Sequence, residues 1–593
     1  MAIYNAPLRD MSFLLNDVLQ IDKYANLPGF ADATPDLISA ILEEGAKIAQ
    51  EVLQPLNQVG DKEGCHLIDG EVKTPTGFKG AYDTFVQGGW SGLTAEPEYG
   101  GQGLPNVVGV VVNEMVASAN MAFGMYPGLT GTAYSAILIH GSDAQKQTYL
   151  SKMISGQWSG TMNLTEPHCG TDLGLMRTKA EPQDDGSYKI SGTKIFVSAG
   201  EHDLTENIIH LVLARIPGGP DGVKGISLFI VPKFLINDDG SLAPRNGVSC
   251  GSLEEKMGIH GNSTCVLNYD QATGYLLGAE HKGMRAMFTM MNKARLGVGL
   301  QGLSQSEVSY QNAAAYANER LQGRSISGTK FPDKPADPII VHPDIRRMLM
   351  DQRAFNEGAR ALLYWTALHG DIALKSPDES EKIKSDDYMD LLTPLIKAYF
   401  TDKGFAHAVN AQQVLGGHGY IRESGMEQFV RDARITMIYE GANGIQALDL
   451  VGRKLASDSG RAILAFLEEL GDFVKQHEGD RELAVFVGAV TLGKGYLEDA
   501  MGWLMEHGLK NPDDAGAAST DFLHLFGLVS LAYMWALMAK AAQDKAGGDD
   551  PFYSNKLKTA RYFVERVFPD AASHLAKLKA GADSMMALDA EAF

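Results

Sequence analysis

The spacing of apolar residues changes near Trp158 and separates a helical part of the chain from a strand-forming part. Upstream of Trp158, apolar positions recur every three or four residues, as they do on one face of a helix. The clearest helical segments are residues 35–56, 107–122 and 131–140.

From Trp158 to Gly283, short runs alternate between apolar and polar residues, with clusters of Gly, Asp and Pro between them. These runs are residues 159–167, 188–191, 194–198, 208–215, 226–231 and 264–269. Several short strands separated by turn residues predict a small β-barrel or sandwich.

Helical spacing returns at Met284, and one Gly- and Pro-rich segment, residues 326–341, interrupts it as a predicted surface loop. The stretch 522–539 is nearly uncharged and close to the length that spans a bilayer. It contains a histidine, a glycine and a serine, so we predict a helix buried within a domain in preference to a membrane span.

A chain of 593 residues is too long for one hydrophobic core. The changes in pattern predict four domains: the strand-forming part, a helical domain on each side of it, and one more helical domain at the end of the chain. They are a helical domain at 1–157, a β domain at 158–283, a helical bundle at 284–455 and an extra helical domain at 456–593.

The composition is that of a soluble globular protein, with 45% hydrophobic and 21% charged residues. The 52 basic and 73 acidic residues give a net charge of −21, which opposes nucleic-acid binding. The four cysteines show no disulfide or CxxC spacing, and the N-terminus has no signal-peptide pattern. Together these features predict a cytoplasmic protein.

The candidate for acid–base chemistry is Glu440, which follows an apolar run and Tyr439 and precedes Gly441. Burial beside apolar groups raises a carboxyl pKa toward neutrality, where the carboxylate can act as a general base. The glycine lets backbone amides and a ligand approach closely. In isolation the pair is better explained as an ordinary solvated turn.

Two upstream segments change this interpretation: residues 413–420, Gln-Val-Leu-Gly-Gly-His-Gly-Tyr, and residues 431–434, Arg-Asp-Ala-Arg. Followed by Ile-Tyr-Glu-Gly, they resemble the C-terminal signature of the acyl-CoA dehydrogenase family. The resemblance implies that Glu440 abstracts the substrate α-proton. It also implies an α+β, mostly helical fold: a helical N-terminal domain, a β-barrel middle domain and a helical-bundle C-terminal domain that hold FAD, followed here by the extra helical domain.

Two segments together resemble the middle-domain flavin site of that family. They are residues 164–172 and residues 194–200, Lys-Ile-Phe-Val-Ser-Ala-Gly. Taken alone, the first segment would be an ordinary turn. The resemblance implies that Phe196, where many members have Trp, packs on the flavin, and that Ser198, where many have Thr, reaches its N5 region. The residues assigned to FAD in this part are Leu164, Thr165, Gly170, Thr171, Phe196 and Ser198.

The segment 291–295 resembles the start of the first C-terminal helix of the family, where Arg295 would bind the CoA portion. Asn292 stands where members commonly have Asp. Ala294 occupies the position at which the isovaleryl type carries its base, so that alternative base is absent. The residues assigned to the substrate are Thr171, Asn292, Arg295 and Gly441.

Four residues resemble those that reach the cofactor of a neighbouring subunit: Arg320, Gln413, Gly416 and Gly417. The resemblance therefore implies an oligomer, favoured as a homodimer with a tetramer possible. Ala442, also assigned to the flavin, replaces a common Thr and removes one hydroxyl contact. Arg453 is either a charge partner that tunes Glu440 or a surface cation.

Residues 297–302 match the Gly-x-Gly-x-x-Gly fingerprint of nicotinamide sites, but that site requires a preceding strand. The upstream residues read as helix, so we interpret the glycines as close packing between helices. The 15 histidines form no metal-ligand spacing, and no metal is predicted.

The resemblance implies FAD-dependent α,β-dehydrogenation of an acyl-CoA thioester, with electron-transferring flavoprotein as acceptor. The opening Tyr-x-Ala-Pro-Leu-Arg-Asp-Met and the extra helical domain resemble the long bacterial members. We favour 3-methylmercaptopropionyl-CoA as substrate, oxidised to methylthioacryloyl-CoA in dimethylsulfoniopropionate demethylation. The alternatives are a medium- or long-chain fatty-acyl-CoA dehydrogenase of β-oxidation, an acyl-CoA oxidase, and a DNA-associated relative, which the acidic composition disfavours.

Overall fold

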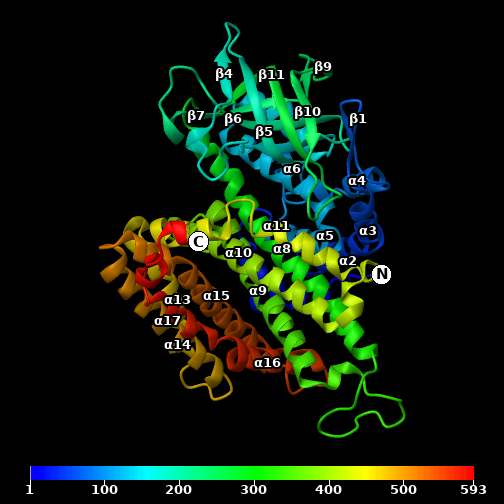
Figure 1. Ribbon diagram of the computed structural model, residues 1–593, viewed down its shortest axis with the longest axis vertical. Coiled ribbons are helices and arrows are strands. Elements are labelled where there is room, and N and C mark those ends of the chain that lie inside the picture. Colours follow the sequence, from blue (N-terminus) through cyan, green and yellow to red (C-terminus); the bar gives the residue numbers. More distant parts are fainter. Residues whose placement is uncertain (1) are drawn as a thin grey trace. The chain divides into compact units, whose positions relative to one another are not determined.

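The computed structural model describes residues 2–593, which form two compact units (Figure 1). We call the first the helical unit; it combines the residues up to Glu43 with 105–114 and 298–593. The second, the sheet unit, combines residues 44–104 and 115–297. Each unit therefore draws on segments that are distant in the sequence.

The sheet unit is built around a seven-stranded sheet. Its strands are β3 (Trp158–Asn163), β4 (Lys179–Pro182), β5 (Tyr188–Ser198), β6 (Asn207–Arg215), β7 (Ile226–Pro232), β10 (Val248–Leu253) and β11 (Thr264–Leu277). The strands β11, β5, β4 and β6 pair in that order, and β7 pairs with both β6 and β11, so five strands close a ring. The predicted barrel is confirmed.

The two runs predicted at 188–191 and 194–198 are one strand, β5. Its pairing with β11 changes register between Cys265 and Leu267 and again between Tyr269 and Ala272. These bulges let the strand pass Gly192 without ending, because a bulge absorbs an extra residue while pairing continues on both sides. Six strands were not predicted: β4 and β10 of the seven-stranded sheet, and the short strands β1 (His66–Ile68), β2 (Glu71–Lys73), β8 (Phe234–Ile236) and β9 (Leu242–Arg245).

Helices pack against the barrel within the sheet unit. They include α3 (Gln54–Glu63), α4 (Phe78–Gln87), α6 (Met121–His140) and α7 (Asp143–Ile154). Residues of α6 and α7 share one apolar core with β3, β6 and β7. The helix predicted at 107–122 is divided, because α5 (Asn106–Ala119) ends and the Asn120 side chain accepts from Phe123 N at 3.0 Å and caps α6.

Long helices dominate the helical unit, and α9, α10 and α15 pack against one another (Figure 1). The helices of residues 283–449 are α8 (Gly283–Glu319, which enters the unit at Val298), α9 (Pro343–Lys375), α10 (Glu379–Val414), α11 (Met426–Thr436) and α12 (Asn443–Asp449). The later helices are α13 (Arg461–His477), α14 (Ala484–Trp503), α15 (Pro512–Gln543), α16 (Pro551–Tyr562), α17 (Asp570–Leu578) and α18 (Asp583–Met586). Two helices lie near the N-terminus, α1 (Leu8–Phe13) and α2 (Pro35–Lys47).

The glycines of the fingerprint-like segment lie inside α8, as the helix-packing interpretation predicts. A Cβ added at Gly302 would lie 2.6 Å from the Phe400 carbonyl oxygen on α10, and one added at Gly299 would lie 2.6 Å from the Ile396 side chain. Only glycine allows α8 and α10 to approach so closely.

Within residues 2–593, α15 is the one helix long and apolar enough to cross a membrane. Yet 89% of its most apolar window is buried inside the protein. Neighbouring helices therefore cover the apolar surface that the stretch 522–539 offers, as predicted for a core helix.

Candidate functional site

A β-bulge in the sheet unit turns Phe196 outward. Lys194 pairs with Leu267 and Val197 with Cys265, so two residues of β5, Ile195 and Phe196, lie opposite a single residue of β11. Phe196 has a left-handed backbone (φ 56°), and its side chain is 61% exposed. A large apolar side chain held outward by a disfavoured backbone conformation indicates a ligand surface.

The first residues of the predicted flavin segment 164–172 are held against β5 by a buried ion pair. Lys194 Nζ donates to Glu166 Oε1 at 2.9 Å and to the Leu164 carbonyl at 3.0 Å, and Ile195 N donates to the Thr165 carbonyl at 2.9 Å. Burial alone would raise the pKa of the Glu166 carboxyl, but Lys194 and hydrogen bonds from Thr178 bring it below the usual value. The charged pair thus keeps the two segments in one arrangement.

The other predicted site residues of the sheet unit differ in their exposure. Gly170 and Thr171 are exposed, and Thr165 and Ser198 are half-buried. On α8, Asn292 is exposed, whereas Arg295 is 6% exposed. An exposed aromatic ring beside hydroxyl and backbone donors fits the apolar ring and polar edge of a flavin.

The helical unit contains Glu440 in a tight turn between α11 and α12. Glu440 has φ 58° and Gly441 has φ 86°, so two successive residues are left-handed. The Gln446 side chain donates to the Glu440 carbonyl at 3.0 Å, and the Tyr439 hydroxyl donates to the Gln301 side chain. Glu440 is half-buried, so its carboxylate is reachable while its backbone is held.

The remaining predicted residues of the helical unit are exposed: Arg320, Gln413, Gly416, Gly417 and Ala442. Beside the glycine pair, Tyr420 is 82% and Ile421 is 52% exposed. Arg453 is 56% exposed and forms an ion pair with Asp449 at 2.7 Å. This pairing supports a role in helix α12 and its continuation, and the role of Arg453 in tuning Glu440 stays a prediction.

Four family descriptions match the chain in order. They are "Acyl-CoA dehydrogenase, N-terminal domain" at 39–157, "middle domain" at 161–272, "C-terminal domain" at 281–455, and "Acetyl-CoA dehydrogenase C-terminal like" at 466–589. The chain is also 43% identical to 3-methylmercaptopropionyl-CoA dehydrogenase of Ruegeria pomeroyi, over 98% of this chain and 99% of that protein. The chain belongs to the acyl-CoA dehydrogenase family.

Two further acyl-CoA dehydrogenases extend the comparison. The broad-specificity linear acyl-CoA dehydrogenase of Mycobacterium tuberculosis is 34% identical over the full length of both chains. The crystal structure of an acyl-CoA dehydrogenase complexed with FAD from Bacillus anthracis has the same fold, with a TM-score of 0.76, 22% identity, and coverage of 92% of this chain and 89% of that one. As a family member, this chain is an FAD-dependent oxidoreductase that acts on acyl-CoA thioesters.

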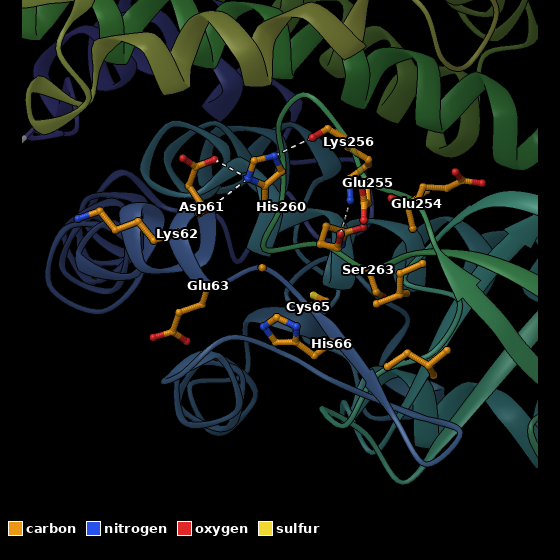
Figure 2. A pocket seen from close by; sticks show the side chains of 15 residues that line it. Asp61, Lys62, Glu63, Cys65, His66, Glu254, Glu255, Lys256, His260 and Ser263 are labelled. Atoms are coloured by element: carbon orange, nitrogen blue, oxygen red, sulfur yellow. Dashed lines mark hydrogen bonds and ion pairs between the residues drawn. The ribbon is translucent and has the colours of Figure 1, made fainter.

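A separate hollow of about 400 Å³ in the sheet unit contains none of the predicted acyl-CoA dehydrogenase site residues (Figure 2). It is lined by residues 61–67, 253–256, 260 and 262–264, and His260 bridges the carbonyls of Asp61 and Lys256 across it, at 2.9 and 2.8 Å. Burial raises the pKa of the Cys65 thiol to about 11, so near neutral pH the hollow offers no thiolate nucleophile.

Within residues 2–593, one group of side chains has metal-like spacing: Glu166, His168 and Cys169. The Glu166 oxygens already accept from Lys194, from the Thr178 hydroxyl at 2.5 Å and from the amides of Arg177 and Thr178. The cluster is therefore explained by hydrogen bonding within the flavin-site scaffold, and we propose no metal there.

Sequence reasoning missed the residues that hold the Glu440 turn: Lys397, Asp402 and His524. Lys397 is fully buried and donates to the Gly441 carbonyl at 2.7 Å. A signal was present, because Lys397 is the one charged residue in the mainly apolar run Leu391–Phe400. A buried lysine needs fixed partners, so a lone lysine in an apolar helix indicates a specific contact.

Proposed function

We propose that Glu440 is the general base of an α,β-dehydrogenation and that the preferred substrate is 3-methylmercaptopropionyl-CoA. The observation that carries the first part is the left-handed turn at Glu440 and Gly441, which holds the backbone of a reachable carboxylate. The 43% identity with the Ruegeria pomeroyi enzyme over nearly the whole chain supports the second part.

In this mechanism, Glu440 removes a proton from the α-carbon of the thioester. The Glu440 backbone amide polarises the thioester carbonyl, which acidifies the α C–H bond. Arg295 and Asn292 bind the CoA portion, and Thr171 and Gly441 contact the acyl thioester. FAD, when bound, would supply the acceptor for the hydride that leaves the β-carbon.

FAD is proposed to be held by the residues that resemble the family's flavin site. Phe196 would pack on the flavin ring, and Ser198, Thr165 and Thr171 would supply hydroxyl groups. Leu164 and Gly170 would supply the adjoining backbone, and Ala442 is a further proposed flavin contact. These roles are consistent with the exposure of Phe196, Gly170 and Thr171.

A steady-state panel tests the substrate, using an artificial electron acceptor with 3-methylmercaptopropionyl-CoA and saturated acyl-CoA thioesters of increasing length. We expect the highest kcat/KM with 3-methylmercaptopropionyl-CoA. A preference for medium or long linear chains would instead favour the second candidate, which the full-length similarity to the broad-specificity linear enzyme supports.

Fast reoxidation of the reduced protein in air would identify an oxidase, and turnover with electron-transferring flavoprotein would identify the expected acceptor.

We infer a homodimer, because Arg320, Gln413 and the pair Gly416–Gly417 are proposed to reach the cofactor of a neighbouring subunit. The exposed Tyr420 and Ile421 beside the glycines support an interface at this surface. Light scattering of the FAD-loaded protein is expected to give twice the chain mass. A monomer that keeps full flavin and activity would contradict the inference, and four times the chain mass would indicate a tetramer.

The four free cysteines are consistent with a cytoplasmic enzyme.

A further inference from the structure

The turn that carries Glu440 is in a conformation that needs external support. A left-handed glutamate is disfavoured because its Cβ crowds the following carbonyl oxygen. Such a residue persists only where surrounding contacts over-determine its backbone. Glu440, with φ 58°, is followed directly by left-handed Gly441, so the contacts around the turn decide where the carboxylate lies.

Asn443, the first residue of α12, is the point at which these contacts meet. The buried Lys397 donates from Nζ to Asn443 Oδ1 at 2.8 Å and to the Gly441 carbonyl at 2.7 Å. Because an ammonium group can only donate, this contact defines which end of the Asn443 amide is the oxygen. One side chain of α10 thus holds both the turn and the residue that follows it.

The other end of the Asn443 amide leads to the C-terminal helices. Asn443 Nδ2 donates to Asp402 Oδ1 at 2.7 Å, and Asp402 Oδ2 accepts from His524 Nε2 at 3.0 Å. His524 lies on α15, within the part that matches the separate C-terminal family description. The turn is therefore linked through two hydrogen bonds to His524, a side chain that lies more than 80 residues further along the chain than Asn443.

The His524 ring is itself fixed by its neighbours. It lies edge-on to Tyr399, with ring centroids 5.4 Å apart, and is stacked on His574 at 5.2 Å. His574 Nδ1 lies 2.7 Å from Asp521 Oδ1, which holds that second ring. With 15% of its side chain exposed, His524 presents its Nε2 to Asp402 in one orientation.

We propose that His524 is a positioning residue for Glu440, acting through Asp402 and Asn443, and that the C-terminal helices thereby support the reacting carboxylate. The proposal rests on Glu440 being the general base. His524 contacts no reacting atom in this scheme; it restrains Asp402, which in turn restrains the amide that closes the turn. Loss of its Nε2 donor removes one of the restraints on Asp402 and thereby loosens the backbone that aims Glu440.

Two exchanges at position 524 separate the hydrogen bond from ring packing. His524→Phe keeps a ring against Tyr399 and His574 but removes the donor, whereas His524→Gln keeps a donor at a reach similar to Nε2. The matched control is His574→Phe. It changes the ring that is stacked on His524, and the hydrogen bond that it removes is the one between His574 and Asp521. All variants are studied as the FAD-loaded full chain.

Anaerobic rapid mixing with the best acyl-CoA thioester measures the limiting rate of flavin reduction and the dissociation constant separately. We expect His524→Phe to lower the limiting rate about tenfold with less than a twofold change in binding, because small misplacements of a reacting group reduce rate more than affinity. His524→Gln should recover most of the rate, and His574→Phe should keep it. An unchanged rate in His524→Phe, or an equal loss in His574→Phe, would overturn the proposal.

Hydrogen exchange of the peptide 437–447 tests the positioning step without turnover. Exchange there should quicken about fivefold in His524→Phe and stay at the wild-type rate in His574→Phe, since local opening follows the loss of restraints. Unchanged exchange in His524→Phe would refute the link to the turn. If no acyl-CoA thioester reduces the wild-type flavin, the proposed function fails, and the exchange result still decides whether His524 holds the turn.

Discussion

Glu440→Gln is expected to lower the rate of substrate-dependent flavin reduction by about two to four orders of magnitude, the usual contribution of a general base. The exchange keeps the shape of the side chain and the left-handed turn but removes the proton acceptor. Ala294 occupies the position of the alternative base, so it cannot take over the proton. Anaerobic rapid mixing of the FAD-loaded variant with an acyl-CoA thioester measures the effect directly.

Binding provides the internal check on this variant. Glu440→Gln should still retain FAD and still show a spectral perturbation when the thioester binds, while failing to bleach the flavin. Glu423→Gln, an exposed carboxyl exchange in the same region, should reduce flavin at the wild-type rate. Flavin reduction near the wild-type rate in Glu440→Gln would place the base elsewhere and leave Glu440 a structural role.

Arg360→Met is expected to destabilise the helical unit by about 3–5 kcal/mol, the usual cost of removing one partner from a buried ion pair. The Arg360 guanidinium is 1% exposed. It contacts three carboxylates: Asp10 at 2.6 Å, Glu114 at 2.7 Å and Glu307 at 3.1 Å. Its loss would leave these acids in a low-dielectric interior without their shared cation.

This cluster also fastens the two ends of the chain. Lys556 on α16 forms ion pairs with Asp10 and, at 2.6 Å, with Glu357 on α9. Burial raises the pKa of Glu114, and Arg360 and the Tyr364 hydroxyl oppose this by favouring the charged form. Removing Arg360 therefore shifts Glu114 further toward its neutral acid and weakens the attachment of the N-terminal segment.

Urea titration followed by circular dichroism measures the destabilisation. The matched control is Arg347→Met on the same helix, where the side chain is 46% exposed and pairs with Asp344 and Asp351. Solvent screens such a pair, so the control should change stability by less than about 1 kcal/mol. Equal effects of the two exchanges would show that the buried cluster adds nothing beyond ordinary surface pairing.

Much of the architecture is determined by local patterns that can be read from the amino-acid sequence. The predicted runs 208–215 and 226–231 match β6 and β7 nearly to the residue. Both strands are buried on both faces, so each needs a short apolar run, which the sequence shows directly. The helical context around the 297–302 glycines correctly predicts packing between helices. The order of motifs also identifies the family and its cofactor, and selects Glu440 before any coordinates are considered.

The tertiary structure alone decides which distant groups meet. The bulge that turns Phe196 outward depends on the register between β5 and β11, which lie far apart in the sequence. Arg360 meets Asp10, Glu114 and Glu307 only because α9 packs against segments from other parts of the chain. Lys397, Asp402 and His524 converge on the Glu440 turn for the same reason. Hydrophobic spacing reports which face of an element is buried, whereas the partner of a buried polar group is set by the packing of whole helices and strands.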